Sequence, residues 1–352
     1  MILPTEPIGS IPRPPALVEA LQAVGRGQRP AAELEPLFEA ATRDTIARLE
    51  ETGSPVLTDG EQRKASFATY PLHGSPLLAA GGVTIPFADG HTRQLPRLAA
   101  GPFRYSTWAA SYLEAARRHT RKPLKQAVIS ASALSLLYPQ EPIPGYPRQE
   151  FLADLVREAT ADIRRCLDLG ATVQIDFTEA RLALKLDPSK GLLTSFIALN
   201  NQVLGGFSAA ERRRLGVHTC PGGDQDSTHS ADVDYALLLP ELFQLEVGSF
   251  YVQLASEADP ERALRILGRL ASDGKRVFVG VTDPIAREVE TPEQVRDRIL
   301  AAARHIAPSC LGTTDDCGFS PFADDLSTSR ETAFAKIRAR VLGNELASRI
   351  LG

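Results

Sequence analysis

Short apolar stretches alternate with longer amphipathic stretches along nearly the whole chain. Several of the short stretches are rich in β-branched residues and almost wholly apolar, which is typical of strands buried on both faces of a parallel sheet. The longer stretches carry apolar residues at helical spacing. Eight strands are predicted, at Ile2–Ile8, Pro55–Thr58, Gln126–Ser130, Thr172–Ile175, Leu215–His218, Phe250–Leu254, Arg276–Val281 and Cys310–Thr313.

Helical patterns separate these strands, as at Ala31–Glu51, Glu150–Leu169, Pro260–Ser272 and Thr291–Ile306. Strands that alternate with helices indicate βα units and a parallel sheet. Eight such units favour an α/β fold of the (β/α)8 TIM barrel type. No internal repeat, low-complexity tract or linker marks a boundary, so residues 1–352 are expected to form a single catalytic barrel.

One segment between the second and third predicted strands breaks this rhythm. Two extended arms, from Val83 to Pro96, flank the dipeptide Asp89-Gly90. This dipeptide is strongly favoured in tight β-hairpin turns. We therefore expect a β-hairpin insertion after strand 2 that lies over the barrel mouth.

Composition narrows the function to small molecules. The net charge is −4 and charged residues make up 23% of the chain, which argues against a nucleic-acid or anionic-membrane surface. The 4 cysteines form no dense disulfide framework and suit a reducing compartment. The sequence shows neither a signal peptide nor an apolar run long enough to span a bilayer. We expect a cytoplasmic protein, of an oligomeric state that the sequence does not indicate.

Chemically capable side chains follow the predicted strands at their carboxyl ends, where barrel enzymes build their active sites. These residues are Ser10, Asp59, Glu61, Asp176, His218, Cys220, Gln253, Asp283, Asp315, Asp316 and Cys317. Their convergence on one end of the barrel indicates an enzyme.

His218-Thr219-Cys220 and the later Cys317 form a candidate metal site. Residues i and i+2 of an extended strand point to the same side, and Cys317 would join them from the end of strand eight. Imidazole nitrogen and thiolate sulfur suit Zn²⁺. A partly buried histidine beside an inert cysteine is the alternative. Cys166 and Cys310 are interpreted as small core residues.

Such a site favours thiol chemistry over hydrolysis. A free thiol has a pKa of about 8.5, whereas a zinc-bound thiol is deprotonated outright. Two cysteine thiolates already neutralise the ion, which makes it a poorer activator of water and a better platform for a sulfur nucleophile. The expected reaction is alkylation of a thiol.

Five motifs in the same order resemble those of the cobalamin-independent methionine synthases along nearly the whole chain. The motifs are Ile8-Gly9-Ser10, Asp59-Gly60-Glu61, Gln174-Ile175-Asp176, His218-Thr219-Cys220 and Asp316-Cys317-Gly318. The resemblance implies a short, single-barrel form of the family's C-terminal catalytic barrel. It implies a zinc-dependent methyltransferase of methionine biosynthesis, with Zn²⁺ on His218, Cys220 and Cys317. Ser10, Glu61 and Asp176 would bind the thiol, homocysteine first, and a methylated folate is among the implied donors.

The chain departs from the family pattern in three places. Gln253 stands where the family has a zinc-binding glutamate and is the candidate fourth metal ligand, with Glu257, four residues later, as the alternative. Asp283-Pro284 replaces an Asp-Ile-His whose histidine transfers protons. Asp283 and His229 are therefore the candidate catalytic residues, although His229 also fits a solvated loop. Finally, Phe177-Thr178-Glu179 replaces a Glu-Pro near the folate site, which leaves the donor open.

Three other functions are consistent with the sequence. The three-ligand pattern also resembles the epoxyalkane–coenzyme M transferases, which open epoxides with a zinc-bound thiol. A metal-free lyase of the uroporphyrinogen-decarboxylase type would instead need an arginine-rich mouth, and a non-catalytic thiol- or zinc-binding protein is a further alternative. Arg93, Arg97 and Arg104 flank the predicted hairpin, where they would meet an anionic tail or face solvent.

Overall fold

A six-stranded parallel sheet forms the centre of the computed structural model, which describes residues 2–352. The order of its strands is β12-β11-β10-β7-β6-β5. Their bounds are β5 (Lys125–Ile129), β6 (Thr172–Asp176), β7 (Leu215–Thr219), β10 (Ser249–Val252), β11 (Arg276–Gly280) and β12 (Leu311–Thr314). Each lies where a strand was predicted, within a few residues. The eighth begins one residue late, because Cys310 ends a 3-10 turn.

The first two predicted strands are each reduced to a single β-bridge. Thr5 pairs with Thr313 of β12, and Leu57 pairs with Leu124 beside β5. Prolines at 4, 7 and 55 interrupt these segments, and a proline has no N–H to donate to a ladder.

The two segments nevertheless close the barrel against each other. The Thr58 hydroxyl donates to the Gly9 carbonyl (2.9 Å), and the Ile11 N–H donates to the Gly60 carbonyl (3.0 Å). The predicted (β/α)8 barrel is therefore confirmed, with two of its eight strands very short.

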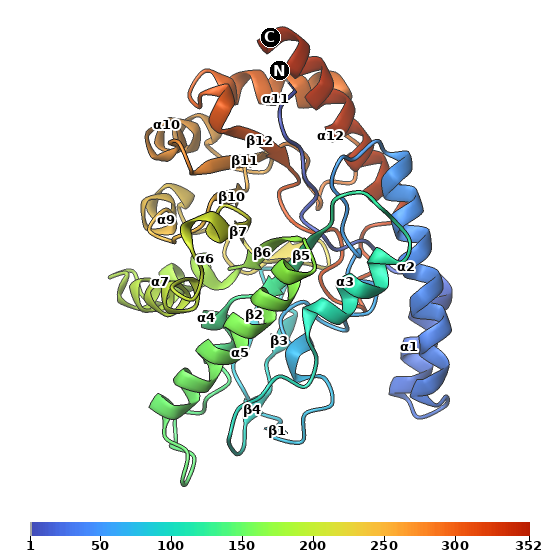
Figure 1. Ribbon diagram of the computed structural model, residues 1–352, viewed down its shortest axis with the longest axis vertical. Helices are drawn as coiled ribbons and strands as arrows, with labels where there is room; N and C mark the ends of the chain where they lie inside the picture. The colour runs from blue at the N-terminus through green and yellow to red at the C-terminus, as the bar shows by residue number, and fades with distance from the viewer. Residues whose placement is uncertain (1) are drawn as a thin grey trace.

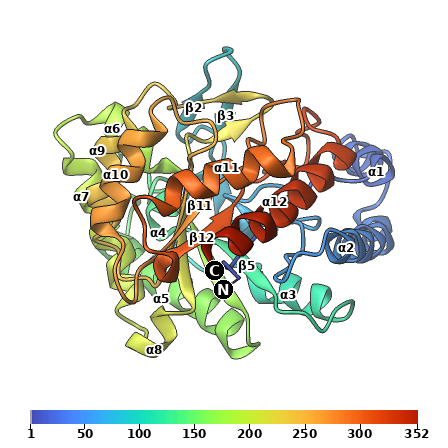
Figure 2. The same cartoon turned by 90° about the horizontal axis from the view of Figure 1, so that it is seen from above.

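Helices surround the strands on the outside of the barrel (Figures 1 and 2). They are α1 (Pro15–Gly25), α2 (Leu34–Glu51), α3 (Ala109–Arg117), α4 (Ala131–Ser135), α5 (Arg148–Asp168), α6 (Glu179–Leu186), α7 (Gly191–Leu204), α8 (Ala209–Arg212), α9 (Tyr235–Leu242), α10 (Pro260–Leu270), α11 (Pro292–Ala303) and α12 (Arg330–Leu351), with 3-10 turns at Ala31–Glu33, Tyr70–Leu72 and Pro308–Cys310. The four predicted helices are all present. Within residues 2–352, no helix combines the length and apolarity needed to cross a membrane.

The two ends of the chain lie side by side (Figures 1 and 2). The N–H of Leu3 donates to Ser348 Oγ of α12 (3.0 Å), and the amide of Asn344 donates to the Leu3 carbonyl (2.8 Å). The last helix therefore holds the first strand segment in place against β12.

The predicted hairpin insertion is confirmed. β2 (Thr84–Pro86) and β3 (Thr92–Gln94) pair antiparallel around the Asp89-Gly90 turn, and β1 (Leu78–Ala79) and β4 (Arg97–Leu98) extend the arms. At its tip, the N–H of Ala88 donates to the Thr228 carbonyl (3.0 Å). Thr228 belongs to a second small hairpin, β8 (Gly223–Asp224) and β9 (Ser227–Thr228), in the loop after β7.

Arg93 fastens the hairpin over the barrel mouth. Its guanidinium pairs with Asp224 after β7 (Nε–Oδ2 2.5 Å) and with Asp324 after β12 (Nη1–Oδ2 2.8 Å). The expectation that Arg93 meets an anionic tail or faces solvent is therefore wrong, because both sides of its guanidinium are occupied by carboxylates.

A buried arginine ties the loops of the barrel mouth together. Arg13 is 3% exposed and donates to the carbonyl oxygens of Glu61 (2.8 Å), Lys64 (2.7 Å), Ser320 (2.6 Å) and Phe322 (3.1 Å). A further bond reaches Ser320 Oγ (3.1 Å). One side chain thus connects the segments that follow the first strand, the second strand and β12.

Replacing Arg13 with methionine should lower the free energy of unfolding by about 3–5 kcal/mol, because several buried carbonyl groups lose their donor. Urea denaturation followed by circular dichroism measures the change. Arg43→Met, at an exposed position of α2, is the matched control and should change stability by less than about 0.5 kcal/mol. Equal stability of the two variants would contradict the role of Arg13.

Candidate active site

A cavity of about 490 Å³ lies at the carboxyl ends of the strands. Its floor is polar and its walls, which come from the hairpin, α1, α4, α6 and neighbouring loops, are largely apolar. The polar floor consists of Ser10, Glu61, Gln174, Asp176, His218, Cys220, His229 and Cys317. The barrel therefore gathers most of the predicted site residues around one space.

His218, Cys220 and Cys317 form the predicted metal constellation. One ligand atom from each lies within 4.8 Å of the other two, and the Sγ atoms of Cys220 and Cys317 are 3.1 Å apart. His218 and Cys220 come from the end of β7, while Cys317 follows β12. The predicted convergence of these three residues across the barrel is confirmed as geometry.

The three residues shift one another's pKa values. The Cys317 thiol donates toward Cys220, and this lowers the pKa of Cys220 well below its usual range. The same contact raises the pKa of Cys317. Burial acts to lower the pKa of His218, but the neighbouring Cys220 sulfur outweighs it and raises the pKa. One thiolate beside an imidazole is thus already favoured in this cluster.

The residues of the motif Asp316-Cys317-Gly318 have separate structural roles. Asp316 accepts hydrogen bonds from the N–H groups of residues 254, 255 and 256 (2.7–2.9 Å), which fixes the loop after β10. Gly318 must lack a side chain, because a Cβ there would overlap the Ser10 hydroxyl. Gly280 likewise leaves room for the Asp316 carboxylate. Cys317 therefore lies between Asp316, which is fixed by hydrogen bonds, and Gly318, which has no room for a side chain.

Gln253 and Glu257 differ in their availability. The amide nitrogen of Gln253 donates to Ser256 Oγ (2.9 Å), and within residues 2–352 its buried Oε1 has no hydrogen-bond partner. Val252 lies opposite Thr219 in the sheet, so Gln253 follows the register toward Cys220. Glu257 is bound to Arg181 (2.6 Å). Among the described residues, Gln253 therefore offers a buried, unpaired acceptor, whereas the Glu257 carboxylate is engaged in an ion pair.

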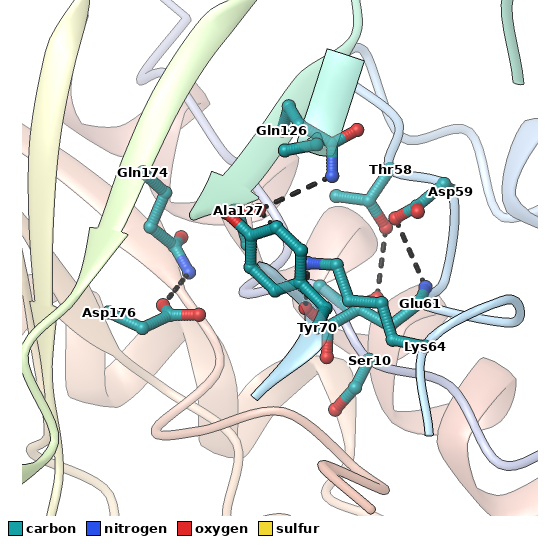
Figure 3. A network of polar contacts seen from close by, with 12 residues as sticks. Ser10, Thr58, Asp59, Glu61, Lys64, Tyr70, Gln126, Ala127, Gln174 and Asp176 are labelled. Carbon is teal, nitrogen blue, oxygen red and sulfur yellow. Dashed lines mark hydrogen bonds and ion pairs between the residues drawn. The ribbon is translucent and has the colours of Figure 1, made fainter. Parts of the chain in front are cut away.

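Glu61 sits in an unusual backbone and is held by a buried cation. Gly60 and Glu61 both have left-handed φ angles (65° and 56°), a conformation that costs a non-glycine residue about 1–2 kcal/mol. The ammonium of Lys64 donates to Glu61 Oε1 (2.8 Å) and to the Ala127 carbonyl (3.0 Å), as Figure 3 shows. Burial acts to lower the pKa of Lys64, but Glu61 and Asp59 outweigh it and raise the pKa.

Asp176 lies across the cavity floor from Glu61 (Figure 3). Its Oδ1 accepts from the amide of Gln174 (2.8 Å). Burial raises the pKa of Asp176 to about 6, while His218 acts in the opposite direction. Ser10 completes the predicted group, and its Oγ accepts the N–H of Ser320 (3.1 Å). All three predicted substrate-binding residues line the cavity.

His229 is buried where it lines the cavity, so its interpretation as a solvated loop histidine is wrong. Its Nδ1 contacts Ser230 Oγ (2.8 Å), and that hydroxyl donates to the Pro221 carbonyl (3.1 Å). Because the hydroxyl proton is used there, Nδ1 carries the imidazole proton and Nε2 is left as the acceptor. Burial lowers the pKa of His229 to about 4, so the ring is neutral at physiological pH.

Asp283 is placed differently from the other predicted residues. Its Oδ1 accepts the N–H of Ile285 (2.9 Å), which forms a local turn, and its own N–H donates to Glu290 (2.8 Å). It is absent from the cavity lining among the described residues. The structure therefore gives Asp283 a role in shaping the loop after β11.

Sequence reasoning missed Lys64, Arg13 and Glu179. Lys64 follows Glu61 by three residues, a spacing that permits an ion pair, but its burial depends on the whole barrel. Glu179 belongs to the segment that departs from the family motif, and it lines the cavity. The available signal for all three was a charged residue three positions after a recognised motif.

Lys64→Met should lower the free energy of unfolding by about 3–5 kcal/mol, because it leaves the Glu61 carboxylate buried without a cation. The double variant Glu61→Gln, Lys64→Met should recover at least half of this loss. Urea denaturation of the wild type, both single variants and the double variant gives the coupling free energy. Additive effects would contradict a direct Glu61–Lys64 pair.

Comparison with known proteins identifies the family of this fold and site. The family model described as "Cobalamin-independent synthase, Catalytic domain" matches residues 3–337. The methionine synthases of Saccharolobus solfataricus and Sulfurisphaera tokodaii are each 22% identical to the chain. The alignments cover 98% of this chain and 95% and 92% of those proteins, respectively.

Two solved structures share the fold. A B12-independent methionine synthase from Shewanella sp. W3-18-1, in complex with selenomethionine, superposes with a TM-score of 0.77 at 18% identity, covering 100% of this chain and 99% of that one. A putative vitamin-B12 independent methionine synthase from Listeria monocytogenes gives a TM-score of 0.73 at 20% identity, with coverage of 98% and 99%. Both support the barrel architecture.

Proposed function

Because the chain belongs to the cobalamin-independent synthase catalytic-domain family, we propose that it is a single zinc-dependent barrel, residues 1–352, that alkylates a thiol. Methyl is the first candidate for the transferred group, and homocysteine is the first candidate for the acceptor. The observation that carries the proposal is the meeting of His218, Cys220 and Cys317 on the floor of a cavity that also holds Glu61 and Asp176.

The residues present fit Zn²⁺. The donor set is one imidazole and two thiols, which is the soft set that zinc prefers. Both ring nitrogens of His218 are buried without a partner among residues 2–352, so one is available to a metal ion. Gln253 Oε1 is the candidate for a fourth ligand, because it is buried and unsatisfied in the same part of the chain. When bound, the ion would keep the substrate sulfur deprotonated at neutral pH.

The protein's own groups would bind the thiol and orient its proton. Glu61, Asp176 and Ser10 would hold the amino-acid end of the thiol, with its sulfur toward His218 and the cysteines. His229 Nε2, as the free acceptor of a neutral ring, would accept a hydrogen bond from the thiol and orient its proton. The sulfur then forms a bond to the alkyl carbon, the bond from that carbon to its leaving group breaks, and the leaving group takes the electron pair and the proton.

The acidic floor favours an amine-bearing thiol over an anionic one. Two carboxylates, Glu61 and Asp176, line the space where the non-sulfur end of the acceptor would lie. They would attract an ammonium group and repel a sulfonate, so the coenzyme M type of acceptor is disfavoured. The Shewanella relative binds selenomethionine, which carries an amino-acid end of the same kind.

Within residues 2–352, the cavity lining lacks the free arginines that the lyase alternative requires. Of the residues in 2–352 that line the cavity, Arg93 is the one arginine, and it is paired with both Asp224 and Asp324. A uroporphyrinogen-decarboxylase-like site would need several free arginines for substrate carboxylates. Thiol alkylation is therefore the better supported function.

The purified protein should contain about one zinc ion per chain, measured by plasma emission spectrometry, because His218, Cys220 and Cys317 supply a catalytic-type ligand set. The variant Cys220→Ser, Cys317→Ser should lose the metal and any acceleration of methionine formation from homocysteine and methyl iodide. The matched control, Cys166→Ala, Cys310→Ala, should retain both. Full zinc content in the Cys220, Cys317 variant would refute the site.

Removing the amino group of the thiol should weaken binding by about tenfold or more, because the carboxylates on the cavity floor lose a charged partner. Calorimetry with homocysteine and 4-mercaptobutanoate, which lacks only the amino group, measures this ratio. Glu61→Gln should reduce the ratio, since the interaction with the ammonium is removed from the protein side. An unchanged ratio in Glu61→Gln would exclude this residue from amino-group recognition.

A further inference from the structure

The cavity has a second region, above the polar floor, whose chemistry suits a different molecule from the thiol. Its walls are built mainly from apolar side chains carried by the hairpin, helices and loops around the mouth. They include Leu21, Phe67, Ile85, Phe87, Leu134 and Leu182. Burial of apolar surface against such walls is worth about 25 cal/mol per Å². An uncharged, largely apolar molecule is therefore the natural occupant.

Free cations are missing from these walls within residues 2–352. Arg93 is the one Lys or Arg that lines the cavity, and its guanidinium is already held by Asp224 and Asp324. The other two arginines near the hairpin are also engaged, since Arg97 donates to the Ala80 carbonyl (3.2 Å) and Arg104 pairs with Asp154 (2.9 Å). An anionic group held within these walls would be buried without a partner, which is costly.

Glu179 is one of several polar residues in these walls, and it carries a buried polar atom without a partner among residues 2–352. Glu179, at the start of α6, is 5% exposed and lines the cavity. Its Oε1 accepts both the Ser130 hydroxyl (2.6 Å) and the Ser132 hydroxyl. Its Oε2 is buried and has no hydrogen-bond partner in the part of the chain that the structure describes. Buried polar atoms are nearly always paired, so an unpaired one beside a cavity points to a ligand.

The surroundings of Glu179 hold its side chain in one place. Asn200 on α7 donates to Ser132 Oγ (2.7 Å), and the Ser132 N–H donates back to the Asn200 side chain (3.3 Å). Ser130 is also the N-cap of α4. Burial raises the pKa of Glu179 to about 7, and Asp176 adds to the shift, so the carboxyl group carries a proton for much of the time near neutrality. A protonated carboxyl group can donate a hydrogen bond.

We propose that the second substrate, the alkyl donor, is an uncharged and largely apolar molecule whose nitrogen or oxygen acceptor is bound by Glu179. This inference rests on the proposed thiol alkylation and specifies its other substrate. It separates the two ends of the cavity, with an amine-bearing thiol on the acidic floor and a neutral donor against the apolar walls. Glu179 is then a specificity-determining residue for the donor.

Three bicyclic aromatic probes test the proposal by calorimetry with the intact protein. They are quinoxaline, which is neutral with two ring acceptors, naphthalene, which has the same shape without them, and quinoxaline-6-carboxylate, which is anionic. After the difference in their water-to-octanol transfer free energies is subtracted, quinoxaline should bind about tenfold more tightly than naphthalene, the value of one hydrogen bond in a buried site. It should also bind at least about tenfold more tightly than the carboxylate, whose charge is buried unpaired.

Two variants assign the preference to Glu179. Glu179→Leu should reduce the corrected ratio of quinoxaline to naphthalene to about one, because the donor is gone. Glu179→Gln should keep the ratio, because its amide still donates. Circular dichroism of both variants checks that the barrel is folded. Tighter binding of the carboxylate, or an unchanged ratio in a folded Glu179→Leu, would overturn the proposal.

The test of the neutral donor site can succeed or fail independently of the test of thiol alkylation. These binding ratios need neither a metal ion nor turnover, so the neutral subsite stands even where no thiol is alkylated. Conversely, methionine formation with an anionic donor such as methyltetrahydrofolate, together with no binding of quinoxaline, would keep the proposed function and reject the neutral donor.

Discussion

The mouth of this barrel depends on the hydrogen bonds of one buried guanidinium. The first two strands are too short to close the sheet through a regular ladder, since each forms a single bridge. Arg13 compensates by joining the loops after the first strand, the second strand and β12 through carbonyl acceptors. Ser10, Glu61 and Cys317 are carried by these same loops. A fixed cation with several donors in one plane therefore sets the relative positions of the thiol-binding and metal-binding candidates.

Charge is arranged around the cavity so that each ionised group has a defined task. Lys64 pairs with Glu61 from behind, and Arg93, in the cavity wall, pairs with Asp224 and Asp324. The floor presents the carboxyl groups of Glu61 and Asp176 to a substrate, whereas the walls above it carry no free cation among the residues described. His229 adds a neutral base at the boundary between the two regions. This separation lets one small space accept two substrates of unlike polarity.

The sequence predicted the barrel and most of the site because both rest on local patterns. Almost wholly apolar strands, with reactive residues at their ends, predict the cluster of His218, Cys220 and Cys317 from the sequence. What could not be predicted depends on distant contacts. The burial of His229 arises from its position between Gly222 and Phe87 of the hairpin, and the engagement of Arg93 requires two loops that are about a hundred residues apart in sequence. The turn formed by Asp283 depends only on neighbouring residues. The sequence nevertheless indicated Asp283 as a catalytic candidate, because it stands where the family has Asp-Ile-His.

The contact between the two ends of the chain constrains how the protein can be made. The first strand segment is held by Thr313 of β12 and by Asn344 and Ser348 of α12. During synthesis on the ribosome, those partners emerge long after the segment itself. The first strand segment must therefore wait, unpaired, until β12 and α12 have been translated, and the loop that carries Ser10 cannot reach its final place earlier. Assembly of the active site is thus a late event in folding, although Ser10 is synthesised well before the other site residues.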